Sequence, residues 1–228
     1  YFILDKMNLR NTITNKNLKN NKKDIRFQIN DLQCYNETLD DSDLEEYEDN
    51  STYVMNIFGI DEENESISVK VLGFKPRFYI NIPNKWNNNK IKIFIDSIKG
   101  LVKKRYKDSI HSYKSLFRIK FRGFTNDEKL KFIKLTFNNT YSLRAYMYVL
   151  KRKIAISSLY RGKKKFDLYE TNIEPFIRFC HIQDIKPSGW VHIEESKYTV
   201  NNLKMTSCQK EITVKWNDVK PDDNTHIA

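Results

Sequence analysis

Alternation of apolar and polar residues marks several β-strands in the first third of the chain and again near its end. A period of two is typical of strands that bury one face. It predicts strands at residues 25–31, 53–60, 66–72 and 77–82, with the polar residues 61–64 forming a hairpin loop between the second and the third. Three more short strands are expected in GWVHIE, YTVNNLKMTS and QKEITVKW, after residue 188.

The middle of the chain changes to helical spacing. Residues 89–106 carry apolar side chains on one face and lysines on the other, which predicts an amphipathic helix. Residues 115–124 alternate basic and apolar side chains and predict a strand. Residues 125–137 begin with the capping-box pattern Thr125-x-x-Glu128 and predict a second helix, and 143–154 favours a helix in its first half.

The segment YETNIEPFIRFCHIQDIKPSGW, residues 169–190, contains side chains that are common in catalytic sites. Thr171-x-x-Glu174 and Pro175 predict the start of a helix that runs to about residue 185. Its stripe of Ile173, Phe176, Ile177 and Cys180, widened by Phe179 and Ile182, predicts a mostly buried helix.

Glu174, Arg178 and His181 share one face of this helix, at i, i+4 and i+7. They suit either an acid–base cluster or a salt bridge with a neighbouring histidine, and we favour the salt bridge. Cys180 and His181 are adjacent, so they point about 100° apart on a helix and cannot form a nucleophile–base pair. The sequence therefore predicts a core cysteine and no catalytic site here.

These elements predict an α+β fold. A mixed, mainly antiparallel, barrel-like (OB-like) sheet would combine residues 25–83 and 186–228, with an acidic loop at 37–51. A basic two-layer ferredoxin-like α/β unit and the buried helix, residues 84–185, would be inserted between its two parts. Residues 1–24 are expected to be a flexible lead-in.

Composition narrows the class of protein. The chain of 228 residues can hold one large or two small domains. Its three cysteines, Cys34, Cys180 and Cys208, have no spacing for a disulfide framework or a zinc site, which fits an intracellular setting. No stretch is long and apolar enough for a membrane span. Because the chain opens without a methionine, we expect it to be a segment cut from a larger protein.

Charge is divided unevenly along the chain. The net charge is +11, yet residues 37–65 contain twelve acids and no Lys or Arg, while residues 85–165 contain 23 Lys or Arg against four acids. A block this basic attracts polyanions by counterion release, although Lys and Asn are frequent throughout the sequence. We therefore expect nucleic-acid contact in the basic unit.

The expected phosphate contacts are the basic clusters of this unit. They are Lys103, Lys104, Arg105, Arg118, Lys120, Arg122, Lys151, Arg152, Lys163, Lys164 and Lys165. Tyr106, Phe124 and Tyr160 are candidate stacking partners for bases. No catalytic, cofactor-binding or metal site is predicted, and the pair Asp41-x-Asp43 is expected to be solvated charge in the acidic loop.

Four segments together resemble the N-terminal part of family B DNA polymerases, closest to the large DNA virus and delta-like branch. They are FQIND (27–31), VMNIFGIDEENESISVKVLGFKPRFYINIP (54–83), FRGFTNDEKLKFIKLTFNN (121–139) and YETNIEPFIRFCHIQDIKPSGWVHI (169–193). The last two are the most specific. Two departures are Arg77, where the family usually has an aromatic residue, and Thr171, where it usually has Ser.

The resemblance implies a DNA-directed DNA polymerase, a nucleotidyltransferase, with a 3′–5′ exonuclease. This chain would be a non-catalytic N-terminal region that flanks template DNA, packs on the exonuclease domain and ends before that domain's Asp-x-Glu motif. The resemblance also implies Mg²⁺ in the catalytic domains beyond residue 228. Replication accessory proteins are possible partners. The protein would act in the nucleus or in a cytoplasmic virus factory. A free-standing single-stranded nucleic-acid-binding module and a protein-interaction scaffold are the alternatives.

Overall fold

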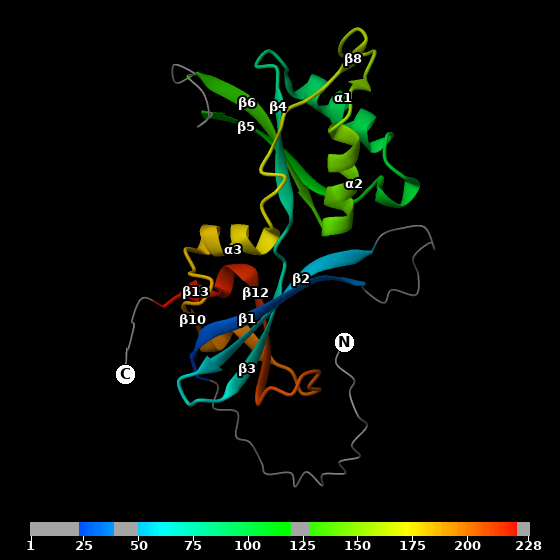
Figure 1. Ribbon diagram of the computed structural model, residues 1–228. Helices are drawn as coiled ribbons and strands as arrows, with labels where there is room; N and C mark the ends of the chain where they lie inside the picture. Colours follow the sequence, from blue (N-terminus) through cyan, green and yellow to red (C-terminus); the bar gives the residue numbers. More distant parts are fainter. Residues whose placement is uncertain (1–22, 39–49, 120–127, 223–228) are drawn as a thin grey trace.

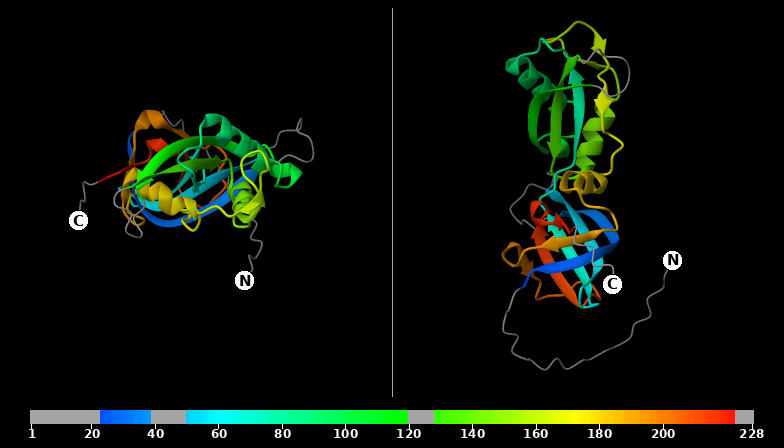
Figure 2. Two further views of the ribbon diagram at one scale, coloured as in Figure 1. Left: turned by 90° about the horizontal axis from the view of Figure 1, so that it is seen from above. Right: turned by 90° about the vertical axis from the view of Figure 1, so that its left-hand side faces the viewer.

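Two lobes make up the part of the chain that the structure describes, residues 23–38, 50–119 and 128–222 of this computed structural model. Figure 1 shows a β-rich lobe below and an α/β lobe above, and both Figure 1 and Figure 2 place helix α3 (Pro175–Gln183) between them. Each lobe has its own hydrophobic cluster. The α+β class predicted from the sequence is therefore confirmed.

The β-rich lobe is a single curled sheet. Its strands are β1 (Ile25–Thr38), β2 (Ser51–Asp61), β3 (Ser66–Leu72), β10 (Trp190–Ile193), β11 (Tyr198–Val200), β12 (Lys210–Lys215) and β13 (Lys220–Pro221). Their order is β11-β12-β3-β2-β1-β10-β13, with β12 and β3 parallel and the other pairs antiparallel. The mixed, mainly antiparallel sheet was predicted. The strands expected at 25–31, 53–60, 66–72 and after residue 188 are present, but the one expected at 77–82 is β4 (Arg77–Ile82) and belongs to the sheet of the other lobe.

Glycine is required at one crossing inside this sheet. A Cβ atom at Gly59 would lie 2.2 Å from the backbone oxygen of Gln28 on β1. The register of β1 against β2 shifts between Ile29 and Asp31, close to this contact. The bulge and the glycine together let β1 bend over β2, which curls the sheet around its core.

The α/β lobe has helices on one side of a four-stranded sheet. Its main elements are β4 (Arg77–Ile82), α1 (Asn88–Lys99), the 3₁₀ turn η1 (Lys104–Tyr106), β5 (Ile110–Ile119), β6 (Lys129–Phe137), α2 (Thr140–Leu150), β7 (Ile154–Ala155), β8 (Lys163–Lys164) and β9 (Leu168–Tyr169). The sheet order is β5-β6-β4-β9, and all its pairs are antiparallel. Two further 3₁₀ turns, η2 (Glu195–Lys197) and η3 (Trp216–Asp218), belong to the other lobe.

The predicted helix at 125–137 is wrong, because this segment forms the central strand β6. Ile133, Leu135 and Phe137 point alternately into the core, at the strand period of two. β6 pairs with β4 on one side and with β5 on the other, so its backbone is satisfied along its whole length. The expected N-cap, Thr125, lies outside the described residues.

Other helices and strands begin or end a few residues away from their predicted boundaries. The predicted helix at 89–106 ends at Lys99, where Gly100 caps it, and only Ile91, Phe94, Ile95 and Ile98 of α1 are buried. The predicted strand at 115–124 begins earlier, at Ile110, and its described part ends at Ile119. β1 continues to Thr38, so the first two residues of the expected acidic loop belong to a strand, and residues 39–49 lie outside the described residues.

Helix α3 is shorter and less buried than predicted. It begins at Pro175, and Glu174 is its N-cap without a side-chain capping bond. Phe179 and Cys180 are buried, but Ile173 and Ile177 are 44% and 51% exposed. The expected capping box is therefore absent, and only half of the predicted apolar stripe faces the core.

Arg178 holds α3 to the preceding loop through a different acid from the predicted one. Its guanidinium is buried and forms an ion pair with Glu170, whose backbone oxygen it also contacts at 3.1 Å. Glu170 has the positive φ of 59° that L-residues rarely adopt. Glu174 and His181 are exposed, so the expected Glu174–Arg178–His181 cluster does not form.

A lysine on β12 is surrounded by the carboxylates of the β2–β3 hairpin. The Nζ atom of Lys210 lies 2.5 Å from Asp61, 2.8 Å from Glu63 and 2.7 Å from Glu65. Hydrogen bonds from Lys210 and Lys23 lower the pKa of Glu63 to about 2. Burial raises the pKa of Asp61, but bonds from Lys210 and two backbone amides outweigh it and leave a lowered pKa.

The Glu170–Arg178 pair gives an asymmetric prediction. Glu170→Gln should lower the free energy of unfolding by about 2–4 kcal/mol, because it leaves the buried guanidinium of Arg178 without its carboxylate. Arg178→Met should cost only about 1–2 kcal/mol, because the Glu170 side chain is 41% exposed and can be hydrated. Urea unfolding measures both, with the exposed His181→Gln as a control. A larger cost for Arg178→Met would contradict this account.

The ion pairs of Lys210 with Asp61, Glu63 and Glu65, here called the Lys210 network, predict that the free energy of unfolding falls at acid pH. The ordinary pKa values are 3.8 for Asp61 and 4.5 for Glu63, and both are lowered in the folded chain. The unfolded chain therefore binds protons first, so the stabilisation is complete above about pH 4.5 and is lost as the pH falls toward 2. Lys210→Met should flatten this loss in urea titrations, whereas the exposed Lys215→Met should not. Parallel pH profiles for the two variants would exclude the network as the cause.

Candidate nucleic-acid interface

No helix of the described residues covers one face of the four-stranded sheet in the α/β lobe. Phe78 and Ile80 of β4 point toward α1 and α2 and belong to the core. Figure 1 shows both helices on the same side of β4, β5 and β6. Because side chains alternate along a strand, Arg77, Tyr79 and Asn81 point to the other face. We call this surface the open sheet face.

Three cations lie on the open sheet face, on neighbouring strands. Lys134 of β6 stands directly opposite Lys114 of β5 and opposite Tyr79 of β4. Burial lowers the pKa of Lys134, and the charges of Arg77 and Lys114 lower it further. The Nε atom of Arg77 is buried and has no hydrogen-bond partner within the described chain. Among described residues, none of these three cations forms an ion pair, so the face collects positive charge that nothing nearby neutralises.

Aromatic side chains adjoin the cations on the same face. Tyr79 stands opposite Tyr169 of β9, and the rings of Phe132 and Tyr169 meet edge to face at 5.3 Å. Phe132 is only 5% exposed, whereas Tyr79 and Tyr169 are half-buried. The open sheet face therefore combines positive charge with aromatic surface, which is the composition of surfaces that bind single-stranded nucleic acids.

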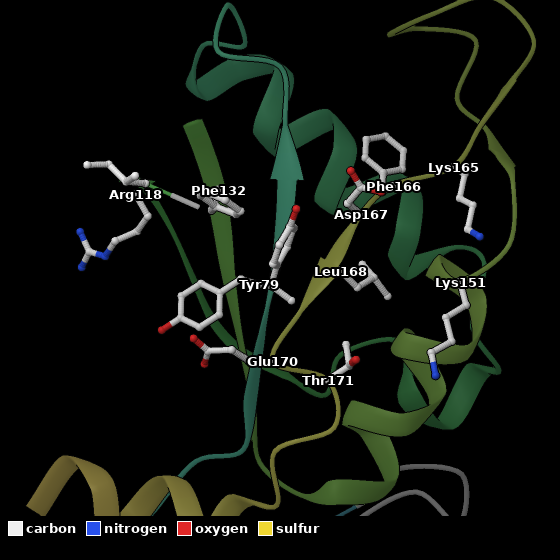
Figure 3. Close-up of a pocket in the computed structure, with 12 residues that line it drawn as sticks. Tyr79, Arg118, Phe132, Lys151, Lys165, Phe166, Asp167, Leu168, Glu170 and Thr171 are labelled. Carbon is white, nitrogen blue, oxygen red and sulfur yellow. The ribbon is translucent and has the colours of Figure 1, made fainter. Parts of the chain in front are cut away.

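A pocket of about 820 Å³ continues from this face past β9. Three of the residues expected to contact phosphate line it, namely Arg118, Lys151 and Lys165. Figure 3 shows Arg118 on one side of Tyr79 and Phe132, and Lys151 and Lys165 on the other. The structure thus brings together basic residues that are far apart in the sequence.

The remaining expected residues lie in other places. Lys163 and Lys164 form the exposed strand β8, and Lys104 lies in η1. Lys103, Arg105 and Arg152 line a second groove beside α2. Lys120, Arg122 and Phe124 lie outside the described residues.

The two described stacking candidates are not open platforms. Tyr106 and Tyr160 both pack against the core of the α/β lobe, and the Tyr160 hydroxyl donates to the backbone oxygen of Ile154 at 3.0 Å. Their aromatic surface is therefore largely used for packing.

Sequence reasoning missed Arg77, Lys114 and Lys134. Lys134 was hidden because β6 was taken for a helix, where its partners across the sheet cannot be seen. Arg77 did give a signal, because it stands where the resembled family usually has an aromatic residue. A basic residue at the start of a predicted strand, on the face opposite to the apolar one, would have pointed to the open sheet face.

The remaining reactive groups of the described chain are held by burial or by an ion pair. Burial raises the pKa of the Cys180 thiol to about 11, so it stays protonated and unreactive near neutral pH. Asp61, Glu63 and Glu65 have oxygens within 4.8 Å of one another and could hold a metal ion, but the ammonium group of Lys210 already contacts all three. Asp41 and Asp43 lie outside the described residues. No helix of the described part is long and apolar enough to cross a membrane.

Comparison with known proteins relates the chain to DNA polymerases. Residues 166–227 match the model of the DNA polymerase family B exonuclease domain. The chain is 30% identical to a DNA polymerase of Acanthamoeba polyphaga mimivirus over 212 residues, which cover 89% of this chain and 12% of that protein. It is 33% identical to a DNA polymerase of Pyramimonas orientalis virus over 208 residues, 90% of this chain and 16% of that protein.

More distant relatives extend the similarity. The DNA polymerase delta catalytic subunit of Arabidopsis thaliana is 25% identical over 171 residues, 73% of this chain and 15% of that protein. The fold is similar to the family B DNA polymerase of the hyperthermophilic archaeon Pyrobaculum calidifontis, with a TM-score of 0.53 and 15% identity over 86% of this chain and 21% of that one. The chain thus spans less than a quarter of each of these relatives, and the matches identify it as a segment belonging to DNA polymerase family B.

Proposed function

We propose that this chain is the non-catalytic N-terminal region of a DNA-directed DNA polymerase with 3′–5′ exonuclease, which acts in DNA replication. Its role is to scaffold the exonuclease domain and to hold single-stranded template DNA on the open sheet face. The observation that carries this proposal is the group of Arg77, Lys114 and Lys134, three cations that, among the described residues, have no carboxylate partner and lie on a face without a covering helix.

The electrostatics of this group favour an anionic ligand. Like charges directly opposite each other on neighbouring strands destabilise a sheet. Lys134 is also partly desolvated, and this raises the cost of keeping it charged. A phosphate backbone along the face would offset both costs and would release counterions. The same charges without such a ligand only weaken the fold.

The aromatic residues favour a single strand over a duplex. Bases can stack on Tyr79 and Tyr169 only where they are unpaired. Phosphates on either side could then reach Arg118, Lys151 and Lys165 around the pocket, with Lys163 and Lys164 of β8 further along the same path.

Several coarser features support assigning the chain to such an enzyme. The order strand–helix–strand–strand–helix–strand with sheet order β5-β6-β4-β9 supports a ferredoxin-like description of the α/β lobe, and the curled sheet supports an OB-like one. The two hydrophobic clusters support two subdomains, with β4 joining the predicted 84–185 insert and α3 joining the barrel-like part. The exposed Ile173 and Ile177 of α3 offer apolar surface to the rest of the exonuclease domain.

The proposal extends to features outside the described residues. The complete protein would use Mg²⁺ in its catalytic domains, work inside the cell in a nucleus or a virus factory, and associate with replication accessory proteins. An Asp-x-Glu motif on a strand shortly after residue 228, if found in the complete protein, would support this proposal. A stop codon there would favour the free-standing single-stranded nucleic-acid-binding module, while a protein-interaction scaffold would leave DNA unbound.

The open sheet face gives a direct test. Lys114→Gln combined with Lys134→Gln should weaken binding of the 228-residue chain to a single-stranded oligonucleotide. Because each lost phosphate contact removes roughly 0.7 from the slope of log K against log salt, the slope should fall by roughly 1.4. Fluorescence anisotropy at several salt concentrations measures both quantities.

The matched control is Lys186→Gln combined with Lys215→Gln, which removes the same charge from exposed positions on the β-rich lobe. It should change the salt slope far less. If both double variants weaken binding equally, the loss reflects net charge alone and the open sheet face is not the binding surface.

A further inference from the structure

A second groove lies on the helical side of the α/β lobe. It has a volume of about 580 Å³ and runs between α2 and the turn that follows α1. Figure 1 places α2 on the side of the sheet opposite to the open sheet face. This groove is therefore separate from the surface proposed for DNA, and its ligand needs its own explanation.

Its rim is basic. Four cations line it, Lys103 and Arg105 from the turn and Arg144 and Arg152 from α2 and its end. None of its eleven lining residues is acidic, and within the described chain none of these four cations has a carboxylate partner. The rim is therefore complementary to an acidic ligand.

The arginines are held by the tyrosines of the groove. The guanidinium of Arg105 lies 4.6 Å from the centre of the Tyr106 ring, and that of Arg152 lies 4.2 Å from the centre of the Tyr148 ring. Each arginine covers one face of its ring, so a base cannot stack there. A guanidinium stacked in this way keeps N–H groups at its edge for a carboxylate, although Nη2 of Arg152 also donates to the Tyr148 hydroxyl.

The floor of the groove is aliphatic. Leu101 is 45% exposed, and Val102, Ala145 and Val149 lie partly buried beside it. Aliphatic surface gives no stacking energy to a base, but it accepts apolar side chains such as leucine. The floor and the rim together fit a polypeptide that carries both acids and apolar anchors.

From these contacts we infer that the groove binds an acidic segment of a partner protein, with apolar anchor residues on the aliphatic floor and carboxylates on the arginine rim. This mode of recognition is common where a peptide lies along a helix in a groove. A nucleic acid fits less well, because the floor is aliphatic and because arginines cover one face of Tyr106 and of Tyr148, which leaves Tyr141 as the groove tyrosine without an arginine of the described chain over its ring.

The chain's own acidic stretch could span the whole groove only at full extension. Residues 39–49 contain seven acids, and their two ends are fixed at Thr38 and Ser51, which are paired across β1 and β2. Going out and back leaves about five residues each way, or roughly 17 Å when fully extended. Hydrogen bonds of Asn36 and Asn139 hold this hairpin at the start of α2, which is itself about 16 Å long. The stretch could reach the far end, at Arg152, only when completely taut.

The test uses a fluorescein-labelled peptide of about 12 residues that repeats Glu-Glu-Leu-Glu, added to the full chain. Arg144→Glu combined with Arg152→Glu should weaken its binding at least about tenfold, because two contacts become repulsive. The control Lys163→Glu combined with Lys164→Glu makes the same charge change on β8 and should stay within about twofold. Leu101→Ser should weaken the peptide but leave a charge-matched oligoglutamate unchanged, because only the peptide uses the aliphatic floor.

Each remaining outcome overturns the inference. Equal losses in the two double variants, or equal binding of peptide and oligoglutamate, would show only non-specific attraction of polyanions. Competition by a single-stranded oligonucleotide that disappears with Arg144→Glu and Arg152→Glu would identify a nucleic-acid site. Binding that appears only after residues 39–49 are replaced by a Gly/Ser linker would show that the chain's own acidic stretch occupies the groove. Thermal melting confirms that the variants remain folded.

Discussion

The alternation of side chains along β6 controls both the stability of the α/β lobe and its surface chemistry. Because β6 is hydrogen-bonded on both sides, its side chains can point only toward the helices or away from them. Ile133, Leu135 and Phe137 take the helical side and build the core. Phe132 and Lys134 must then lie on the open sheet face, where Lys134 meets Lys114 across the pair of strands. A register shift of one residue would exchange the two sets and destroy the core.

The uneven distribution of acids along the sequence explains why positive charge on the α/β lobe remains unneutralised. Twelve acids of the sequence fall in residues 37–65, and Lys70 and Lys210 already bind four of those that the structure describes, Glu37, Asp61, Glu63 and Glu65. The α/β lobe keeps its cations without partners on two opposite surfaces. The open sheet face adds aromatic rings, whereas the groove beside α2 adds an aliphatic floor and two rings that arginines cover on one face, Tyr106 and Tyr148. Different anions therefore suit the two surfaces.

Much of the architecture could be predicted from the sequence. The strands of the β-rich lobe have clear alternation and turn residues, so their existence and order of appearance followed directly. The failure at β6 has a physical cause. KLKFIKLTF contains apolar residues on both strand faces, and this pattern resembles helical spacing. Pairing with its two neighbouring strands makes the segment a strand and not a helix. The burial of Arg178 also depends on its ion pair with Glu170. The left-handed backbone conformation of Glu170 cannot be predicted from the local sequence pattern. The phosphate-contact residues were chosen from basic runs, but a surface is built by strands that are distant in sequence, so Arg77, Lys114 and Lys134 were found only in three dimensions.

The central claim is that the positive charge of the open sheet face binds the phosphate backbone of a nucleic acid. Its most direct test is the pKa of the Lys134 ammonium group, measured by NMR on lysine side chains with and without a single-stranded oligonucleotide. The account predicts a pKa below that of exposed lysines in the free chain, because of burial and of Arg77 and Lys114, and a rise when DNA is added. An ordinary pKa that does not change with DNA would contradict it.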